Sequence, residues 1–151
     1  MPTEILSGIW IGDINDSFNI PFIKDNLISI LINCTVDYDF LDLENIKKLR
    51  IPLSCNLTPE KDLRLLKNNK DKILTYIFEN MEEHNILIYC YDGVTISPLI
   101  SALFLIKYGN ISKDDIRSIL RSKNNKVTIQ YLNYFNYLPD QLRVPRPKCE
   151  I

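Results

Sequence analysis

The stretch "ILIYCYDGVTIS", residues 86–97, decides how the rest of the chain can be arranged. It starts as an apolar run, ends that run at Cys90, and opens into a short loop before the apolar segment "PLISALFLIKY". An unbroken apolar run of strand length is typical of a parallel strand buried on both faces, and a hydroxyl residue followed by an early proline indicates a helix start. The sequence therefore predicts a strand, a loop and a buried helix, with Cys90 at the carboxyl end of the strand.

Similar segments lie on both sides of this unit. Strands are predicted in "ILSGIWIGD", which bends at Gly8, in "NLISILINCT" and in "LRIPL". Helices are predicted over residues 16–25, with an interruption near Pro21, and over residues 58–84, 97–110, 112–123 and 128–138. Alternating strands and helices favour an α/β fold, a mainly parallel sheet flanked by helices, whose ligands bind at the carboxyl ends of the strands. Because helix amides attract anions, the loop after Cys90 is interpreted as an anion site.

Length and charge limit the function classes. The chain has 151 residues, of which 46% are hydrophobic, and we expect one domain over residues 1–142 followed by a proline-broken tail over 143–151. Lys plus Arg number 18 against 19 for Asp plus Glu, so no overall field attracts nucleic acid or an anionic membrane. No apolar stretch reaches the ~20 residues of a membrane helix. A small basic set is interpreted as a solvated face: Arg117, Arg121, Lys123 and Lys126.

The cysteines show no metal-site spacing. Cys34, Cys55, Cys90 and Cys149 lie far apart, so we expect reduced thiols in a cytoplasmic protein, with no metal and no cofactor. Abundant Ile, Asn and Lys beside only four glycines are typical of an AT-rich genome, such as that of a large DNA virus or a protist. For a viral protein the compartment would be the host cytoplasm.

The order of these elements resembles the dual-specificity protein phosphatases of the cysteine-dependent phosphatase superfamily. "IWIGD" resembles the family's "LYLGN" strand, "ISILINCT" its "ITHILNVT" strand, and "LRIPL" the strand before its acid loop. "LIYCYDGVTIS" resembles its signature loop, and "LISALFLIKYGNISKDDIRSIL" its helix pair. The resemblance runs through nearly the whole chain and implies that family's α/β fold.

The signature loop departs from the family pattern. The family has His, Cys, five residues, Arg and then Ser or Thr, where this chain has Tyr89, Cys90, "YDGVT", Ile96 and Ser97. The resemblance implies that Cys90 stands at the nucleophile position and that Ile96 replaces the arginine that grips phosphate. Tyr89 replaces the histidine that helps to hold the thiol as thiolate. The family's general-acid aspartate corresponds to Cys55, in "IPLSC".

These replacements predict a catalytically degenerate protein, a pseudophosphatase. Losing a buried bidentate charged contact costs about 2–5 kcal/mol, and a missing general acid costs about 10²–10⁴ in rate. We therefore assign no catalytic residue, and treat Tyr89, Cys55 and the loop as degenerate positions. Gly93 is expected to allow a tight turn, and the resemblance implies that Ser97 assists departure of the thiol. The degenerate phosphate-binding loop comprises Cys90, Tyr91, Asp92, Gly93, Val94, Thr95, Ile96 and Ser97.

Three functional hypotheses follow, in this order. The first is a non-catalytic module that regulates signalling by binding a protein partner. The partner would bind the former substrate face, around Tyr91, Val94 and Ile96. Asp92 is expected to weaken the attraction of this face for phosphate. The second is a residual or altered phosphatase that uses Cys90, or a phosphoprotein trap held by the loop amides and by Arg117 or Arg121. The third is a structural subunit of a homodimer that packs through the aromatic helix predicted over 128–138. None of the three involves a membrane or nucleic acid.

Overall fold

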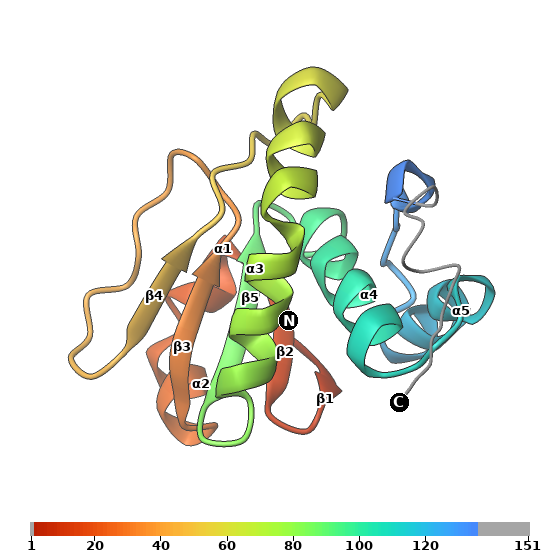
Figure 1. Cartoon of the computed structure of the whole chain (residues 1–151). Coiled ribbons are helices and arrows are strands. Elements are labelled where there is room, and N and C mark those ends of the chain that lie inside the picture. The colour runs from red at the N-terminus through yellow and green to blue at the C-terminus, as the bar shows by residue number, and fades with distance from the viewer. Residues whose placement is uncertain (1, 136–151) are drawn as a thin grey trace.

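A five-stranded sheet forms the centre of the computed structural model, which describes residues 2–135 (Figure 1). The strand order is β1-β2-β5-β3-β4. β1 runs antiparallel to β2, and the other neighbouring strands are parallel. The predicted mainly parallel sheet is confirmed, with the strand that carries Cys90 at its centre. The strands are β1 (Thr3–Leu6), β2 (Ile9–Asp13), β3 (Ile28–Asn33), β4 (Lys47–Arg50) and β5 (Asn85–Cys90).

Helices cover both faces of the sheet (Figure 1). One face packs against α1 (Ile14–Ser17) and α2 (Ile20–Asp25), and the other packs against α3 (Arg64–Asn80), α4 (Ile96–Tyr108) and α5 (Lys113–Lys123). A short π-helix, Pro59–Leu63, leads into α3, and a 3-10 turn, Leu132–Phe135, follows α5. The helices predicted over residues 16–25, 58–84, 97–110 and 112–123 are therefore confirmed, with somewhat different bounds.

Alternation along β5 decides which side chains can meet at the site. Successive strand residues point to opposite faces. Ile86, Ile88 and Cys90 belong to the apolar cluster on the α3–α5 side, whereas Leu87 and Tyr89 belong to the cluster on the α1–α2 side. The sheet thus separates the side chain of Tyr89 from that of Cys90.

Two elements differ from their predicted bounds because of proline. The strand predicted in "LRIPL" is β4, which ends at Arg50, since Pro52 has no amide hydrogen for a ladder. β4 also lies at the edge of the sheet and is not buried on both faces as predicted. Pro21 does not interrupt a helix. It lies in the first turn of α2, and the break falls at Phe18 and Asn19, where the Asn19 side chain caps α2.

The helix predicted over residues 128–138 is wrong in its first part. Residues 128–130 are not helical, and Tyr131 has a φ of 65°, which ends any helix there. Only the 3-10 turn follows within the described residues. Residues 136–138 of this prediction, the domain boundary at 142 and the tail over 143–151 lie outside the described residues.

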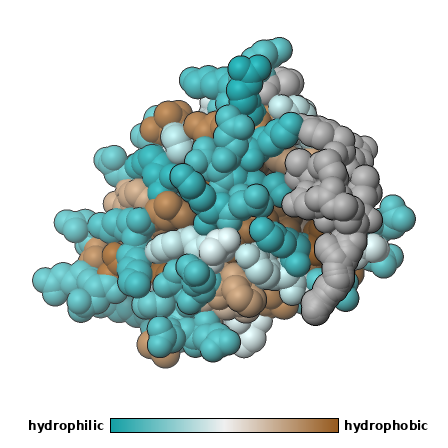
Figure 2. All heavy atoms as spheres, in the orientation of Figure 1, coloured by the Kyte–Doolittle hydropathy of each residue, from teal (hydrophilic) through white to brown (hydrophobic). Residues whose placement is uncertain are grey.

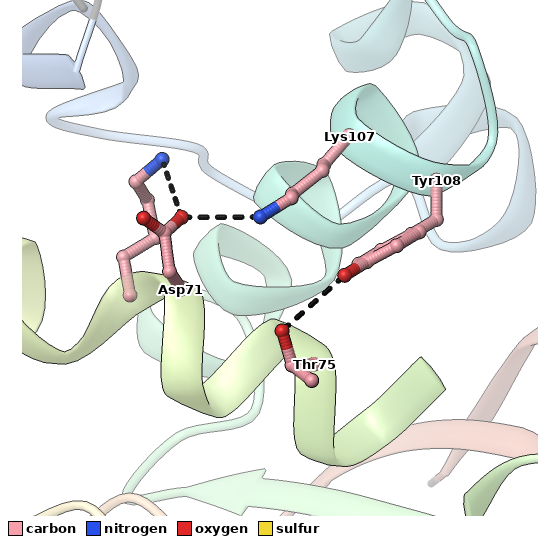
Figure 3. A network of polar contacts seen from close by, with 5 residues as sticks. Asp71, Thr75, Lys107 and Tyr108 are labelled. Atoms are coloured by element: carbon pink, nitrogen blue, oxygen red, sulfur yellow. Dashed lines mark hydrogen bonds and ion pairs between the residues drawn. The ribbon is translucent and has the colours of Figure 1, made fainter. Parts of the chain in front are cut away.

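Polar contacts join α3 to α4, the helix that follows the Cys90 loop (Figure 3). The Asp71 carboxylate lies 3.2 Å from Lys107 Nζ, and the Thr75 hydroxyl lies 3.4 Å from that of Tyr108. Tyr108 also stacks on Phe78 with ring centroids 4.3 Å apart. These contacts fix the C-terminal end of α4 against α3.

Apolar side chains on the face seen in Figure 2 appear in small groups between hydrophilic ones. This distribution agrees with the two buried clusters, which take most of the strand residues. Within residues 2–135, no helix combines the length and the apolar character that crossing a membrane requires.

Candidate functional site

The loop between β5 and α4 surrounds the thiol of Cys90. β5 ends at Cys90, and α4 begins at Ile96. The turn depends on Gly93, which has a φ of 74° and approaches the end of β2 closely. A Cβ at this position would lie 3.0 Å from the backbone nitrogen of Asp13 and the carbonyl carbon of Gly12. The predicted role of Gly93 in a tight turn is confirmed.

Backbone amides point at the Cys90 sulfur. The amides of Gly93 and Ser97 each donate to Sγ at 3.3 Å, and the Ser97 hydroxyl oxygen lies 3.4 Å from it. Ser97 is therefore placed beside the thiol, as the resemblance implied. The Cys90 side chain is 0% exposed, so these contacts replace water around the sulfur.

Asp92 is exposed, and its side chain folds back onto the same loop. Its Oδ1 accepts hydrogen bonds from the amides of Val94 at 3.0 Å and Thr95 at 3.2 Å. Its Oδ2 accepts from the Thr95 hydroxyl at 2.9 Å. Oδ1 also lies 3.6 Å from the Cys90 sulfur. The amides that a bound anion would use are thus engaged by a carboxylate of the loop itself.

Ile96 is a core residue and not a surface contact. Its side chain is 2% exposed and belongs to the apolar cluster under α4. The first turn of α4 turns this side chain inward, so a partner that binds around Tyr91, Val94 and Ile96 would meet little of the Ile96 side chain. Among the described residues, the groups that donate hydrogen bonds to the thiol and to the Asp92 carboxylate all belong to the loop, and none is Lys, Arg or His.

The arginines considered for a phosphate trap bind backbone oxygens. Arg117 donates to the carbonyl of Ile129 at 2.8 Å, and Arg121 donates to that of Val127 at 3.2 Å. Both therefore hold the segment that follows α5 against that helix.

A cavity of about 630 Å³ brings three of the four basic residues close to the outside of the loop. Its lining has mixed charge, because three carboxylates face three cations. One of them, Asp16, caps α1 together with Asp13, and burial raises the pKa of its carboxyl group. Arg117 does not line this cavity. The charged lining residues are Asp13, Asp16, Asp92, Arg121, Lys123 and Lys126.

Cys55 lies close to the loop. It is exposed and lines a cavity of about 250 Å³ together with Thr95 and Tyr131.

Sequence reasoning missed the thiol that neighbours Cys90, which is Cys34. Cys34 follows Asn33, the partner of Tyr89 in the β3–β5 register, and burial together with the nearby Cys90 raises the pKa of Cys34.

Tyr89 lies outside the pocket, on the other face of the sheet. Its side chain is 0% exposed, and its hydroxyl oxygen has no hydrogen-bond partner within the described residues. Burial raises the pKa of Tyr89 to about 12, although the Ser17 hydroxyl lies near enough to oppose this slightly. At this position Tyr89 is a packing residue.

Tyr91 ties the loop to its surroundings, a role that sequence reasoning missed. Its hydroxyl group lies 2.8 Å from Asp37 Oδ1, 3.1 Å from the Leu53 carbonyl oxygen and 3.1 Å from the Val36 amide. Its ring meets that of Tyr38 edge-on, with centroids 5.8 Å apart. Tyr91 therefore offers a partner less free surface than predicted, while Val36, Tyr38 and Tyr131 remain exposed nearby.

The segment that carries Cys55 is held by Asp62, in the π-helix before α3. The Asp62 carboxylate is 1% exposed and accepts from the amides of Ser54 and Thr58 at 3.3 and 3.0 Å, and from both hydroxyl groups. Burial alone would raise the pKa of Asp62, but these hydrogen bonds outweigh it and hold the pKa below its usual value. Asp62 is therefore a charged anchor of this segment and is not poised as an acid.

The described residues contain no group of three or more His, Cys, Asp or Glu side chains that could hold a metal ion. The site as described consists of a thiol, backbone amides, hydroxyl groups and one carboxylate.

Similarity to known proteins is found in the structure and not in the sequence. No protein-family model matches the chain, and no curated protein matches it by sequence. The structure is similar to that of DUSP15, with a TM-score of 0.79 and 20% identity over 93% of this chain and 90% of that chain. It is similar to human DUSP28, with a TM-score of 0.76 and 11% identity over 87% and 90% of the two chains.

A third similar structure is that of the human tyrosine phosphatase-like serine/threonine/tyrosine-interacting protein. Its TM-score is 0.69, with 13% identity over 89% of this chain and 93% of that chain. At such identities the similarity shows the fold alone. The predicted dual-specificity phosphatase-like α/β fold is thereby confirmed, and the chain has the architecture of these phosphatases.

Proposed function

We propose that this protein is a pseudophosphatase, a non-catalytic module with a phosphatase fold that regulates signalling by binding a protein partner in the cytoplasm. The observation that carries this proposal is the residue at the arginine position of the Cys90 loop. Where the resemblance calls for a phosphate-gripping arginine, the loop has Ile96, which is 2% exposed and packs into the core. A bidentate guanidinium is the group best suited to hold two phosphate oxygens.

The remaining chemistry supports the same conclusion. The acid position carries the thiol of Cys55, which is a poor proton donor at a leaving oxygen, and a missing general acid lowers rates by about 10²–10⁴. Losing the buried charged contact costs about 2–5 kcal/mol. Since 1.4 kcal/mol is a factor of about ten, the two losses together would reduce turnover by at least about 10³.

The side chains around the loop opening suggest how a partner would bind. Val36, Tyr38 and Tyr131 are 52%, 42% and 37% exposed, and we call these three residues the loop mouth. Tyr131 shares a cavity with Cys55 and Thr95, and Tyr38 contacts Tyr91. Exposed aromatic residues beside a cavity are typical anchors of protein interfaces.

A residual cysteine-dependent phosphatase is the second candidate, and one observation favours it. The Cys90 sulfur still receives two amide hydrogen bonds at 3.3 Å and has Ser97 beside it. Amides that point at a thiol favour its thiolate form. Against this candidate stands the burial of the thiol. Within residues 2–135, moreover, no Lys, Arg or His side chain donates to the thiol or to the Asp92 carboxylate.

Partner capture from the native cell tests the binding module. The bait carries Tyr38→Arg, and the matched control carries Leu27→Arg. Leu27 is 74% exposed and precedes β3, whereas Val36 and Tyr38 of the loop mouth follow the other end of that strand. Placing a charge in an apolar contact should reduce recovery of a specific partner at least about tenfold in Tyr38→Arg and leave it unchanged in the control. Equal recovery with both baits would place the interface away from the loop mouth and contradict the proposal.

A further inference from the structure

The Asp92 carboxylate lies where the donors of the Cys90 loop converge. It accepts from the amides of Val94 and Thr95 and from the Thr95 hydroxyl, and it lies 3.6 Å from the Cys90 sulfur. These are contacts that an oxyanion bound over the thiol would make. We infer that Asp92 is the resident anion of this loop and that it excludes phosphate groups from the former substrate pocket.

Two further amides of the loop also donate hydrogen bonds to an acceptor within the loop. The amides of Gly93 and Ser97 donate to the Cys90 sulfur at 3.3 Å. With those of Val94 and Thr95, four amides of one short loop have internal acceptors. The hydrogen bonds of the Gly93 and Ser97 amides are buried, and buried amides are costly to leave without partners, so the Cys90 sulfur lets this part of the loop fold with no ligand bound. The amides of Val94 and Thr95 lie at the surface, where they bind Asp92.

A phosphate group would have to displace Asp92 before it could bind. It would also carry negative charge to a site that already holds a carboxylate, and like charges at such distances repel. Among the described residues, no Lys, Arg or His side chain donates a hydrogen bond to the thiol or to the Asp92 carboxylate, and Ile96 points into the core. Three cations line the cavity outside the loop, but three carboxylates on the same lining offset their charge. Asp92 is therefore a specificity-determining residue that favours partners without a phosphate group.

This inference rests on the proposed function in one respect, because it treats the loop as the former substrate pocket. It goes further in naming the chemistry of the partner. The contact would be made by an unphosphorylated protein segment that binds the loop mouth through apolar and neutral polar groups.

Titration with inorganic phosphate, followed through the amide NMR signals of Val94 and Thr95, tests the role of Asp92. The series comprises the wild type, Asp92→Ala and Asp92→Asn, with Asp39→Ala as a control that removes one exposed carboxylate which the loop does not bind. Asparagine keeps an oxygen that can accept from the amides of Val94 and Thr95 but loses the negative charge. It therefore separates the effect of occupying the amides from the effect of the charge. Asp92→Ala should bind phosphate at least about tenfold more tightly than the wild type. Asp92→Asn should gain clearly less, and Asp39→Ala nothing.

Two results for the Asp92 variants would overturn the inference. One is no gain in phosphate affinity in a folded Asp92→Ala relative to the wild type, and the other is an equal gain in Asp92→Ala and Asp92→Asn, because the carboxylate would then not exclude phosphate by occupying the amides. A gain in Asp39→Ala equal to that in Asp92→Ala would also overturn it, because the effect would then be one of net charge. The titration involves neither turnover nor a partner, so its failure leaves the non-catalytic proposal standing. Conversely, turnover by the wild type would refute the proposed function, whatever the phosphate titration showed.

Discussion

A variant that combines Ile96→Arg, Cys55→Asp and Asp92→Ala should hydrolyse aryl phosphates at a rate that disappears when Cys90 is changed to Ser. The scaffold already provides the thiol, the converging amides and Ser97 at 3.4 Å. The three changes add a bidentate cation and a general acid, and they remove the internal carboxylate. A restored general acid alone is worth about 10²–10⁴ in rate, so an increase of at least about 100-fold over the wild type is expected.

The control for this repair is the double variant Ile96→Arg and Cys55→Asp, in which Asp92 is kept. It should stay near the wild-type rate, because the carboxylate still holds the amides of Val94 and Thr95. Ile96 is a core residue, so thermal unfolding must first show that both variants fold. A folded triple variant without measurable hydrolysis would mean that Cys55 or Ile96 is not at the position which the resemblance implies.

Replacing Asp62 with alanine should destabilise the protein by about 2–3 kcal/mol, because the amides of Ser54 and Thr58 would lose a charged, buried acceptor. Such a loss shifts the folding equilibrium about 30- to 150-fold. Asp71→Ala is the matched control. Asp71 also lies in the helical segment before β5. The pKa of Asp71 is below its usual value as well, because its contacts with Lys107 and Lys70 outweigh the opposing effect of burial. Its side chain is 69% exposed, so its loss should cost about 1 kcal/mol or less. Denaturant unfolding at neutral pH measures both changes.

The contribution of Asp62 should also depend on pH in a defined direction. Its pKa in the folded protein lies below the ordinary value of 3.8, so its stabilising effect is fully present above that value. The effect is lost as the pH falls through the lowered pKa, where the carboxylate takes up a proton. The difference between the wild type and Asp62→Ala should therefore shrink at acid pH. A difference that stays constant from neutral pH to well below 3.8 would show that the Asp62 charge does not hold the segment.

The repeated pattern of strands and helices was enough to predict the fold, because a buried parallel sheet needs long apolar runs. β3, β5 and α4 were predicted within a few residues, since burial on both sides leaves few polar positions in them. The errors lie where local chemistry overrides the pattern. Pro52 ends β4 early, and the positive φ of Tyr131 prevents the helix predicted from the spacing of aromatic residues.

Side-chain direction explains what could not be predicted at the site. Tyr89 and Cys90 are neighbours in the sequence, but because side chains alternate along β5, they lie on opposite faces of the sheet. The acidic character of Asp92 was visible in the sequence, whereas its return to the amides of Val94 and Thr95 depends on the path of the loop. The anchoring by Asp62 and the links from Tyr91 to Asp37 and Leu53 join distant segments, which no local pattern reveals.

Hydrolysis of p-nitrophenyl phosphate and of a phosphotyrosine peptide by the wild-type protein tests the central claim most directly. The comparison is with Cys90→Ser, which removes the nucleophile but keeps a side chain of similar size. The account predicts that both proteins give the rate of buffer alone. By the proposal, Ile96 stands where the gripping cation would be and Cys55 where the acid would be, and Asp92 holds the amides of Val94 and Thr95. A clear wild-type rate that vanishes in Cys90→Ser would contradict it and establish the protein as an active cysteine-dependent phosphatase.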